Sequence, residues 1–373
     1  MAVTIQSVAS KKEKKQFLHL PWQIYRQDAN WIPPLRQNQK ELAGFAPHPF
    51  YKQAESQTFL AYQDGQPVGR ISAIINHAHN QRHQEKRGFF GFFETIDDEK
   101  VACSLFEAAQ NWLREKGMTT LRGPLNPSLN YECGLLVDGF DTAPLFMMTY
   151  NRPYYEKLIL RAGFEKEIDL YAFWGHVDMI EKLDQKLFFI IEEAKKRFDI
   201  QLRRLDRKRF NKDVRLFLDI YNQSLVSTWG FVPMSEEEID HTSHSLKHLI
   251  APEMTSIAEI DGRPVGAMFG LLDYNPRIKN IDGRLFPTGF LKLLWNKKRI
   301  KKVRLISTNV IPEYQKWGVG LVLLSRLGPE IINWGIEEVE FSWVLENNTL
   351  SRKTLERGGA KQTKTYRVFH KDL

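Results

Sequence analysis

The sequence predicts a mixed α/β protein made of two tandem copies of one domain, each a mostly antiparallel, twisted sheet flanked by helices. Short β-branched runs alternate with helical patterns along the chain. The sequence DGQPVG at 64–69 recurs as DGRPVG at 261–266, an offset of 197 residues (261 − 64). RAG at 161–163 recurs as RGG at 357–359, an offset of 196 residues (357 − 161). Two separated matches at nearly one offset indicate a duplication.

The composition is that of a globular protein with two domains, which we place at 1–177 and 178–373. The 373 residues are long enough for two cores, and 42% are hydrophobic and 26% charged. No apolar run approaches the ~18 residues that a membrane span needs. Cys103 and Cys133 are the only cysteines, which fits a reducing, cytoplasmic location. The net charge of +8 favours an anionic partner, whether a CoA phosphate, a membrane surface or nucleic acid.

The first domain alternates helices and strands around a tight hairpin. Asp64-Gly65 is a strong hairpin signal, and Pro21 should kink or restart the first helix. Asp97 and Asp98 should cap a helix that stops at Gly117. We expect helices at 13–29, 99–116 and 154–161, strands at 58–63, 67–76, 89–96, 119–122 and 167–174, and irregular chain at 124–150.

The second domain follows the same order. A helix at 178–198 is followed by a strand at 200–205, by helices at 211–227 and 236–249, and by a hairpin of 255–260 with 264–273. A basic-aromatic segment, 284–302, precedes a strand at 303–311, a helix that ends at Trp334, a strand at 338–345, a short helix that ends at Gly358, and a last strand at 361–371.

The turn after the 303–311 strand carries the most informative motif. Pro312 closes the strand, and Gln315-Lys316-Trp317-Gly318-Val319-Gly320 leads into the helix. A helix N-terminus presents free backbone N–H groups at the positive end of its dipole and so binds phosphate groups. The two glycines let the backbone approach an anion, and Lys316 adds a cation. The common motifs G-x-x-x-x-G-K-S/T and G-x-G-x-x-G are absent here.

This Gln-x-x-Gly-x-Gly loop resembles the pyrophosphate loop of the GNAT acyltransferase superfamily. The strand, the helix opened by Asn348 and Ser351, and the final strand are similar to that family's acyl-CoA-binding half. The resemblance implies acetyl-CoA or a longer acyl-CoA as co-substrate, no metal, and N-acyl transfer to a primary amine. It also implies that the following residues contact CoA: Val310, Ile311, Gln315, Lys316, Trp317, Gly318, Val319, Gly320, Asn348 and Ser351.

The first copy lacks the loop and has Asp97-Asp98-Glu99 at the corresponding helix start. These carboxylates satisfy the helix dipole and would repel a pyrophosphate, so we expect a degenerate, non-binding copy. The stretch from Asp273-Tyr274-Asn275 to Pro287 is similar to a subfamily of double-domain proteins. Some relatives of that subfamily are linked to acylation of sphingoid-type amines, as in bacterial ceramide synthesis. The resemblance therefore implies an amine-bearing small molecule or lipid as acceptor.

Acyl transfer to an amine needs an oxyanion donor, a base for the ammonium and an acid for the thiolate. The resemblance implies that the donor is a backbone N–H near Asn309, Val310 or Ile311. The family's frequent Glu on that strand is missing, and Leu355 stands where a Tyr acid is frequent. The candidate catalytic residues are Asn309, Glu346, Tyr274 and Glu132. For each, a turn residue or a solvated charge is the alternative interpretation.

The segment 284–302 combines Phe286, Phe290, Leu294 and Trp295 with a run of lysines and arginines that ends at Arg304. This pattern predicts peripheral contact with the inner membrane face, and a core helix with a solvated basic end is the alternative. No nucleic-acid-binding module is visible. The histidines at 77, 79 and 83 and at 241, 244 and 248 lack the accompanying ligands of a metal site.

Two other functions stay open. A catalytically inactive GNAT-fold scaffold protein would explain the missing Glu and Tyr. A membrane-surface protein with a vestigial CoA loop would explain the basic-aromatic segment. A measurement of CoA binding distinguishes the enzyme from the membrane-surface protein. An acyl-transfer assay distinguishes it from the inactive scaffold protein.

Overall fold

The computed structural model describes residues 2–180 and 185–373. The chain divides into two compact units. The first contains the chain up to Leu170 together with Asn275–Leu293 and Lys364–Leu373, and the second contains Tyr171–Tyr274 and Leu294–Thr363. Two segments that the sequence assigned to the second domain, 275–293 and 364–373, thus cluster with the first unit. Residues 181–184 of the predicted 178–198 helix lie outside the described residues.

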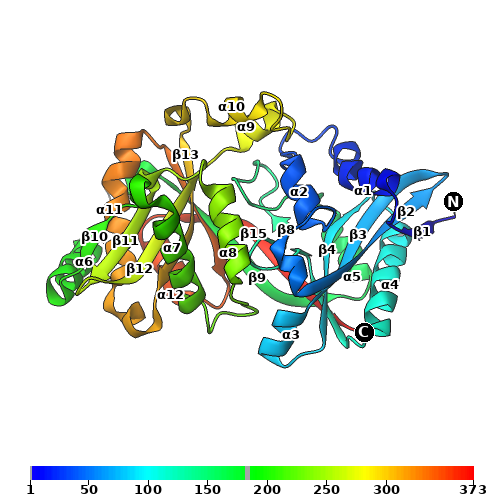
Figure 1. Cartoon of the computed structure of the whole chain (residues 1–373), viewed down its shortest axis with the longest axis horizontal. Helices are drawn as coiled ribbons and strands as arrows, with labels where there is room; N and C mark the ends of the chain where they lie inside the picture. The colour runs from blue at the N-terminus through cyan, green and yellow to red at the C-terminus, as the bar shows by residue number, and fades with distance from the viewer. Residues whose placement is uncertain (1, 181–184) are drawn as a thin grey trace. The chain divides into compact units, whose positions relative to one another are not determined.

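The first unit is a sheet with the order β1-β2-β3-β4-β5-β15. Helices α4 and α5 pack on one face and α1 and α2 on the other (Figure 1). The last strand, β15, pairs antiparallel with β5, from Phe369 opposite Gly123 to Asp372 opposite Thr120. The strands are β1 Thr4–Ser7, β2 Ala54–Gln63, β3 Gln66–Asn76, β4 Arg87–Thr95, β5 Thr120–Gly123, β6 Leu125–Asn126, β7 Glu132–Cys133, β8 Leu135–Asp138 and β15 Lys361–Asp372. The helices are α1 Lys11–Ile24, α2 Arg36–Leu42, α3 His77–His83, α4 Glu99–Glu115, α5 Tyr155–Arg161 and α9 Asn275–Asn280.

The second unit repeats this plan with the strand order β10-β11-β12-β13-β14. Pairing is antiparallel except between β13 and β14, which are parallel. Helices α6 and α11 pack together beside β11 and β12, and α7 packs with α8 (Figure 1). The elements are α6 Gln185–Phe198, β10 Gln201–Arg203, α7 Phe210–Ser224, α8 Glu236–Leu246, β11 Thr255–Ile260, β12 Arg263–Leu272, β13 Lys302–Val310, η6 Pro312–Trp317, α11 Val319–Trp334, β14 Glu338–Leu345 and α12 Thr349–Arg357. Three elements cross the boundary between the units: strand β9, Glu165–His176, helix α10, Gly289–Leu294, and strand β15, whose residues 361–363 belong to the second unit.

The duplication inferred from the sequence is visible in the backbone. The hairpin turns have Asp64 at φ 48° and Gly65 at φ 73° in one unit, and Asp261 at φ 51° and Gly262 at φ 72° in the other. Positive φ at both central residues is the conformation that Asp-Gly hairpins favour. A β-bulge follows Ala61 in the first hairpin and Ala258 in the second, again 197 residues apart (258 − 61). The six-residue match therefore reflects a repeated structure.

Some elements differ from those predicted. Pro21 does not restart the first helix but lies inside α1, where the Tyr25 N–H still donates to the Pro21 carbonyl. Burial of Pro21 with Phe17 and Leu20 offsets the hydrogen bond that proline cannot make. Residues 77–83 form a helix where the sequence predicted no element, and short strands interrupt 124–150. These elements are too short to produce a clear periodic pattern.

Arg304 on β13 is buried, with 2% of its surface exposed. Its Nε donates to Ser342 Oγ at 2.8 Å and its Nη2 to the Ser342 carbonyl at 3.0 Å. Ser342 Oγ in turn donates to the buried Glu340 at 2.6 Å. The interpretation of Arg304 as one of the exposed cations after the basic-aromatic segment is therefore wrong, because its side chain belongs to the β13–β14 contact.

We expect Arg304→Ala to lower the free energy of unfolding by about 3–5 kcal/mol, because it removes the buried cation beside Glu340 and Ser342. Arg263→Ala is a matched control, since Arg263 is half exposed and its pair with Glu313 lies at the surface. We expect the control to cost less than about 1 kcal/mol. Urea titration followed by circular dichroism measures both, and equal losses would contradict the buried role of Arg304.

Candidate functional site

The site begins where strands β13 and β14 separate. Their parallel pairing runs from Lys302 opposite Glu338 to Leu305 opposite Phe341. In the β12–β13 register, Phe269 faces Ser307 while Gly270 faces Leu305, so Ile306 is an extra, bulged residue. Residues 306–310 therefore continue past the pairing with β14. Along this stretch, the edge of β13 that faces β14 lacks the strand pairing that residues 302–305 make with β14.

The direction of the backbone groups on this stretch follows from strand alternation. The Ile311 N–H donates to the Val265 carbonyl, and so points toward β12. Successive residues in a strand direct their backbone groups to opposite edges. The N–H of Val310 is thus directed away from β12, and its carbonyl accepts from Gln315 Nε2 at 3.0 Å on that side. Of the three predicted backbone donors, Val310 is the one whose N–H faces the edge where β14 has separated.

The N-terminus of α11 follows this edge directly. Gly318 is its N-cap residue, and no side chain of the described residues caps it. The first turn of α11 carries no acidic residue. The unsatisfied N–H groups of a helix start and the positive end of its dipole form an anion site. The exposed Lys316 adds a cation, while Trp317 stacks on Phe198 of α6 with ring centroids 4.0 Å apart.

Gly318 has φ 76°, a left-handed conformation that favours glycine. A Cβ there would lie 3.4 Å from Ala194 Cβ, which is an ordinary contact. The backbone conformation at residue 318, rather than a lack of room for a side chain, therefore requires the glycine. At Gly320 a Cβ would lie 3.4 Å from Thr308 Cγ2. The helix start therefore lies close against the 306–310 stretch of β13.

Asn309 is the catalytic candidate that the fold places at this junction. It is buried, with 1% of its surface exposed, and its Oδ1 accepts from Ser307 Oγ at 2.6 Å and Ser224 Oγ at 3.1 Å. Its Nδ2 has no hydrogen-bond partner among the described residues. Buried polar groups are nearly always satisfied, so an orphaned donor in such a place suits a bound acceptor atom. The two hydroxyls hold the amide in one orientation.

The other predicted residues lie in different surroundings. Asn348 caps α12 by accepting from the Ser351 N–H at 3.1 Å, which is the cap expected from the sequence. Glu346 is partly exposed just after β14, and its carbonyl accepts from Arg352. Tyr274 is fully buried, and its hydroxyl donates to the Leu249 carbonyl at 2.8 Å.

Glu132 lies on β7 in the first unit, where burial raises its pKa. Its Oε2 accepts from Asn126 Nδ2 at 3.0 Å. Asn126 Oδ1 in turn accepts from the Phe92 N–H at 2.6 Å. Phe92 lies in a bulge of β4, because Arg70 pairs with Glu94 and Ser72 with Gly91, which leaves both Phe92 and Phe93 opposite Ile71, and Phe92 has a φ of 52°. In the first copy, the bulge of β4 that corresponds to the bulge of β13 is thus occupied by the side chain of Asn126.

The N-terminus of the following helix, α4, is not available to bind an anion. Asp98 is its N-cap, and its carboxylate accepts from the Lys100 N–H at 2.8 Å and the Val101 N–H at 3.3 Å. Glu99 adds a second carboxylate in the first turn. The helix starts of the two copies therefore differ as the sequence suggested: α4 supplies its own anion, and α11 does not.

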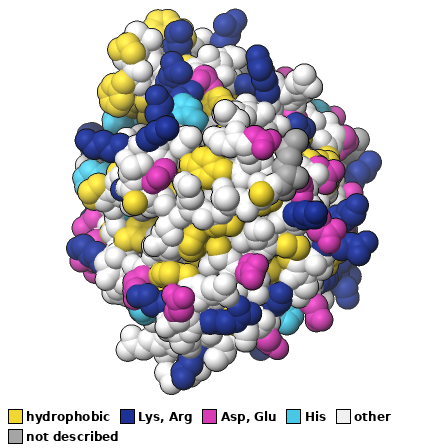
Figure 2. Space-filling view, turned by 90° about the vertical axis from the view of Figure 1, so that its right-hand side faces the viewer, with side chains coloured by type: hydrophobic (Ala, Val, Ile, Leu, Met, Phe, Trp, Pro, Cys, Tyr) yellow, Lys and Arg dark blue, Asp and Glu magenta, His cyan; other side chains and the backbone are white. Residues whose placement is uncertain are grey.

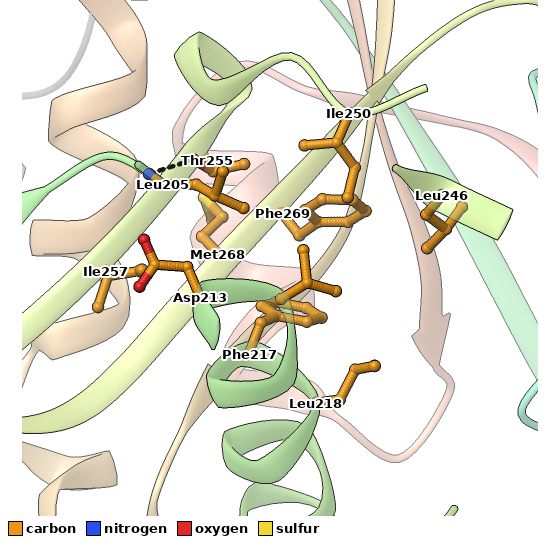
Figure 3. Close-up of a pocket in the computed structure, with 11 residues that line it drawn as sticks. Leu205, Asp213, Phe217, Leu218, Leu246, Ile250, Thr255, Ile257, Met268 and Phe269 are labelled. Carbon is orange, nitrogen blue, oxygen red and sulfur yellow. Dashed lines mark hydrogen bonds between the residues drawn. The ribbon is translucent and has the colours of Figure 1, made fainter. Parts of the chain in front are cut away.

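A small apolar cavity of about 30 Å³ lies between α7, α8 and the β11–β12 hairpin. Figure 3 shows Phe217 and Phe269 side by side at this cavity, with Leu218 below them. Asp213 also lines it, and accepts from Arg203 at 2.9 Å. Phe269 is the β12 residue opposite Ser307, so the cavity lies one strand away from the bulge in β13.

Among the described residues, no group of three or more His, Cys, Asp or Glu side chains is placed to hold a metal ion. No helix in the described ranges is long and apolar enough to cross a membrane.

Two residues that distinguish the copies were missed from the sequence: one lies in the site, and the other closes the equivalent place in the first copy. Ser224 ends α7, 85 residues before Asn309, and nothing local marks it as a partner. Asn126 lies in a stretch predicted as irregular. The contacts of both are set by the tertiary fold, which a local pattern does not encode.

Comparison with known proteins gives close relatives over the whole chain. No protein-family model matches the sequence. It is 35% identical over 376 residues to Protein YghO of Escherichia coli (strain K12), covering 99% of this chain and 95% of that protein. It is 34% identical over 384 residues to the bacterial ceramide synthase of Caulobacter vibrioides (strain NA1000 / CB15N), covering 100% of this chain and 98% of that protein.

Solved structures share the fold at low sequence identity. A tandem GNAT protein from the clavulanic acid biosynthesis pathway superposes with a TM-score of 0.57 and 10% identity, covering 100% of this chain and 98% of that one. A GCN5-related N-acetyltransferase from Sphaerobacter thermophilus has a TM-score of 0.53 and 13% identity, covering 99% and 95%. These matches confirm the predicted fold of two tandem GNAT-like domains.

Proposed function

This chain belongs to the family that contains the bacterial ceramide synthase of Caulobacter vibrioides, and from this premise we propose that it is an acyltransferase that moves an acyl group from acyl-CoA to a primary amine of a lipid. The observation that carries the proposal is the uncapped N-terminus of α11 beside the separated edge of β13. An acyl-CoA has a pyrophosphate that suits the first feature and a pantetheine amide chain that suits the second.

The residues of the second unit fit such a co-substrate. The N–H groups at Gly318, Val319 and Gly320 would hold the pyrophosphate, since backbone donors and the helix dipole act together there. The edge of β13 at 306–310 would pair with the pantetheine amides as a strand does. The orphaned Nδ2 of Asn309 and the N–H of Val310 are the donors available for the thioester oxygen.

The reaction forms one bond and breaks one. The neutral amine nitrogen attacks the thioester carbon, a C–N bond forms, and the C–S bond breaks to release the CoA thiol. The ammonium proton leaves and the thiolate gains one proton. Charge develops on the carbonyl oxygen in the transition state, and preorganised donors there lower the barrier. Because residues 306–310 of β13 include no carboxylate, we assign removal of the ammonium proton to water.

The missing carboxylate, with Leu355 in place of the family's tyrosine, favours one alternative: a GNAT-fold protein that binds acyl-CoA without transferring the acyl group. Thiol release from a long-chain acyl-CoA, measured with and without a long-chain primary amine, separates the two. The proposed enzyme releases one thiol per amide formed, and only when the amine is present. The matching long-chain alcohol is the control acceptor. Release that does not depend on the amine, or no release with any amine, would remove the proposal.

A further inference from the structure

Segment 284–299 exposes large apolar side chains on a firmly held base. Phe286, Leu291 and Trp295 have 82%, 67% and 78% of their surface exposed, and Phe290 has 38%. Large apolar side chains exposed close together mark an interaction surface. Figure 2 shows hydrophobic and basic side chains together at the top of the view, the end at which Figure 1 places α9 and α10.

The base of the segment is fixed to the rest of the first unit. Asn275 Nδ2 donates to the Pro144 carbonyl at 2.7 Å. The backbone and side chain of Arg36 donate to the Gly283 and Asp282 carbonyls, each at 3.0 Å. Trp22 Nε1 donates to the Asp282 carboxylate. The exposed residues therefore project from an anchored support, and their exposure is a feature of the fold.

The segment is also tightly closed on itself. The Phe290 N–H donates to the Leu285 carbonyl at 2.7 Å, and a Cβ on Gly289 would lie 1.8 Å from the Arg284 carbonyl oxygen. Arg277 Nη1 donates to the Leu293 carbonyl at 2.9 Å. Phe286 and Leu291 are thus presented on a preformed turn, which does not have to be ordered when it binds.

The charge of the segment identifies the partner. Residues 283–302 contain no Asp or Glu. Arg284 and Lys292 in the first unit, and Lys298 and Arg299 in the second, are all exposed, so cations flank the apolar residues along the chain, and Asp282 lies 3.7 Å from Arg284 at the start of the segment. We propose that segment 284–299 docks reversibly on an anionic lipid bilayer, with Phe286 and Leu291 inserted at the interface and the cations on the headgroups. This inference extends the proposed function, because it would bring the enzyme to the surface that holds a lipid amine.

Two pairs of substitutions test this surface. The tip variant is Phe286→Ser with Leu291→Ser, and its control is Leu160→Ser with Leu350→Ser, which changes two other exposed leucines. The charge variant is Lys292→Glu with Arg299→Glu, and its control is Lys12→Glu with Lys100→Glu, two exposed lysines in the first unit. All changed residues are exposed, so thermal melting should show that each variant remains folded.

Cosedimentation of the full chain is measured with phosphatidylcholine vesicles and with equimolar phosphatidylcholine–phosphatidylglycerol vesicles. We expect the wild type to pellet with the anionic vesicles, and less as salt increases. The tip variant should lose about tenfold or more in partitioning. The charge variant should lose about tenfold and with it the preference for phosphatidylglycerol. Both controls should pellet like the wild type.

Equal pelleting of the wild type and the tip variant would overturn the proposal. So would a wild-type dimer in sedimentation velocity that the tip variant converts to a monomer, since the surface would then bind a second copy. Acyl transfer to a short, water-soluble amine should be unchanged in the tip variant, while transfer to an amine in anionic vesicles should fall. A protein that pellets as expected but transfers to neither amine would contradict the proposed function alone.

Discussion

Gly318→Glu is expected to weaken CoA binding by a factor of 100 or more. The substitution places a carboxylate at the N-terminus of α11, where the pyrophosphate of the proposed co-substrate would lie. Two like charges about 4 Å apart in partly screened surroundings repel by on the order of 4 kcal/mol. The positive φ of residue 318 adds about 1 kcal/mol of conformational strain for any side chain. Isothermal titration with CoA measures the loss.

Two further variants separate charge from strain and one copy from the other. Gly318→Gln has the same shape and strain without the charge, so it should weaken binding by less than about tenfold. Asp98→Asn removes a charge at the helix start of the first copy and keeps a good N-cap, so CoA binding should not change. If Gly318→Glu and Gly318→Gln bound CoA equally, the loop would not contact the pyrophosphate.

Asn309→Asp is expected to reduce kcat for amide formation by about 10²–10³-fold, the usual cost of removing an oxyanion donor. The change keeps the shape of the side chain but replaces the orphaned Nδ2 with a carboxylate oxygen. Ser224 and Ser307 can still donate to the remaining oxygen. The defect should therefore be in the rate of transfer, and CoA affinity in the titration should change by less than about tenfold.

Asn76→Asp provides the matched control, since it makes the same substitution at another buried asparagine, the N-cap of α3 in the first unit. Asp caps a helix as well as Asn does, so its transfer rate should stay close to that of the wild type. A transfer rate for Asn309→Asp within about threefold of the wild type would show that Asn309 supports the structure of the site but does not stabilise the transition state. The thiol-release assay with a long-chain amine measures both variants.

Much of the fold could be predicted because its signals are local. The Asp-Gly turns, the acidic start of α4 and the glycine turn before α11 each encode a backbone conformation within a few residues. The repeated DGxPVG motif added long-range information, because two copies of one sequence imply two copies of one structure. The same locality explains why the Asn348 cap was predicted correctly.

The parts that were missed depend on contacts between distant residues. Strand β15 pairs with β5, more than 200 residues earlier, and no periodicity in 361–372 indicates which strand it joins. Arg304 looked like an exposed cation because it follows a basic run, yet it is buried against Ser342 on the neighbouring strand. The orphaned amide of Asn309 is likewise defined by Ser224 at the end of α7. Each depends on register between elements, which a single sequence does not display.

Hydrogen exchange with and without a non-hydrolysable acyl-CoA analogue tests the central claim most directly, because it reports on both copies in one experiment. The second copy alone has an uncapped helix start beside a separated strand edge, while Asn126 and Asp98 close the first. We therefore predict slower exchange of backbone amides at 306–322 and no change at 92–104. Protection at 92–104, or equal protection of both segments, would contradict the assignment of acyl-CoA to the second copy.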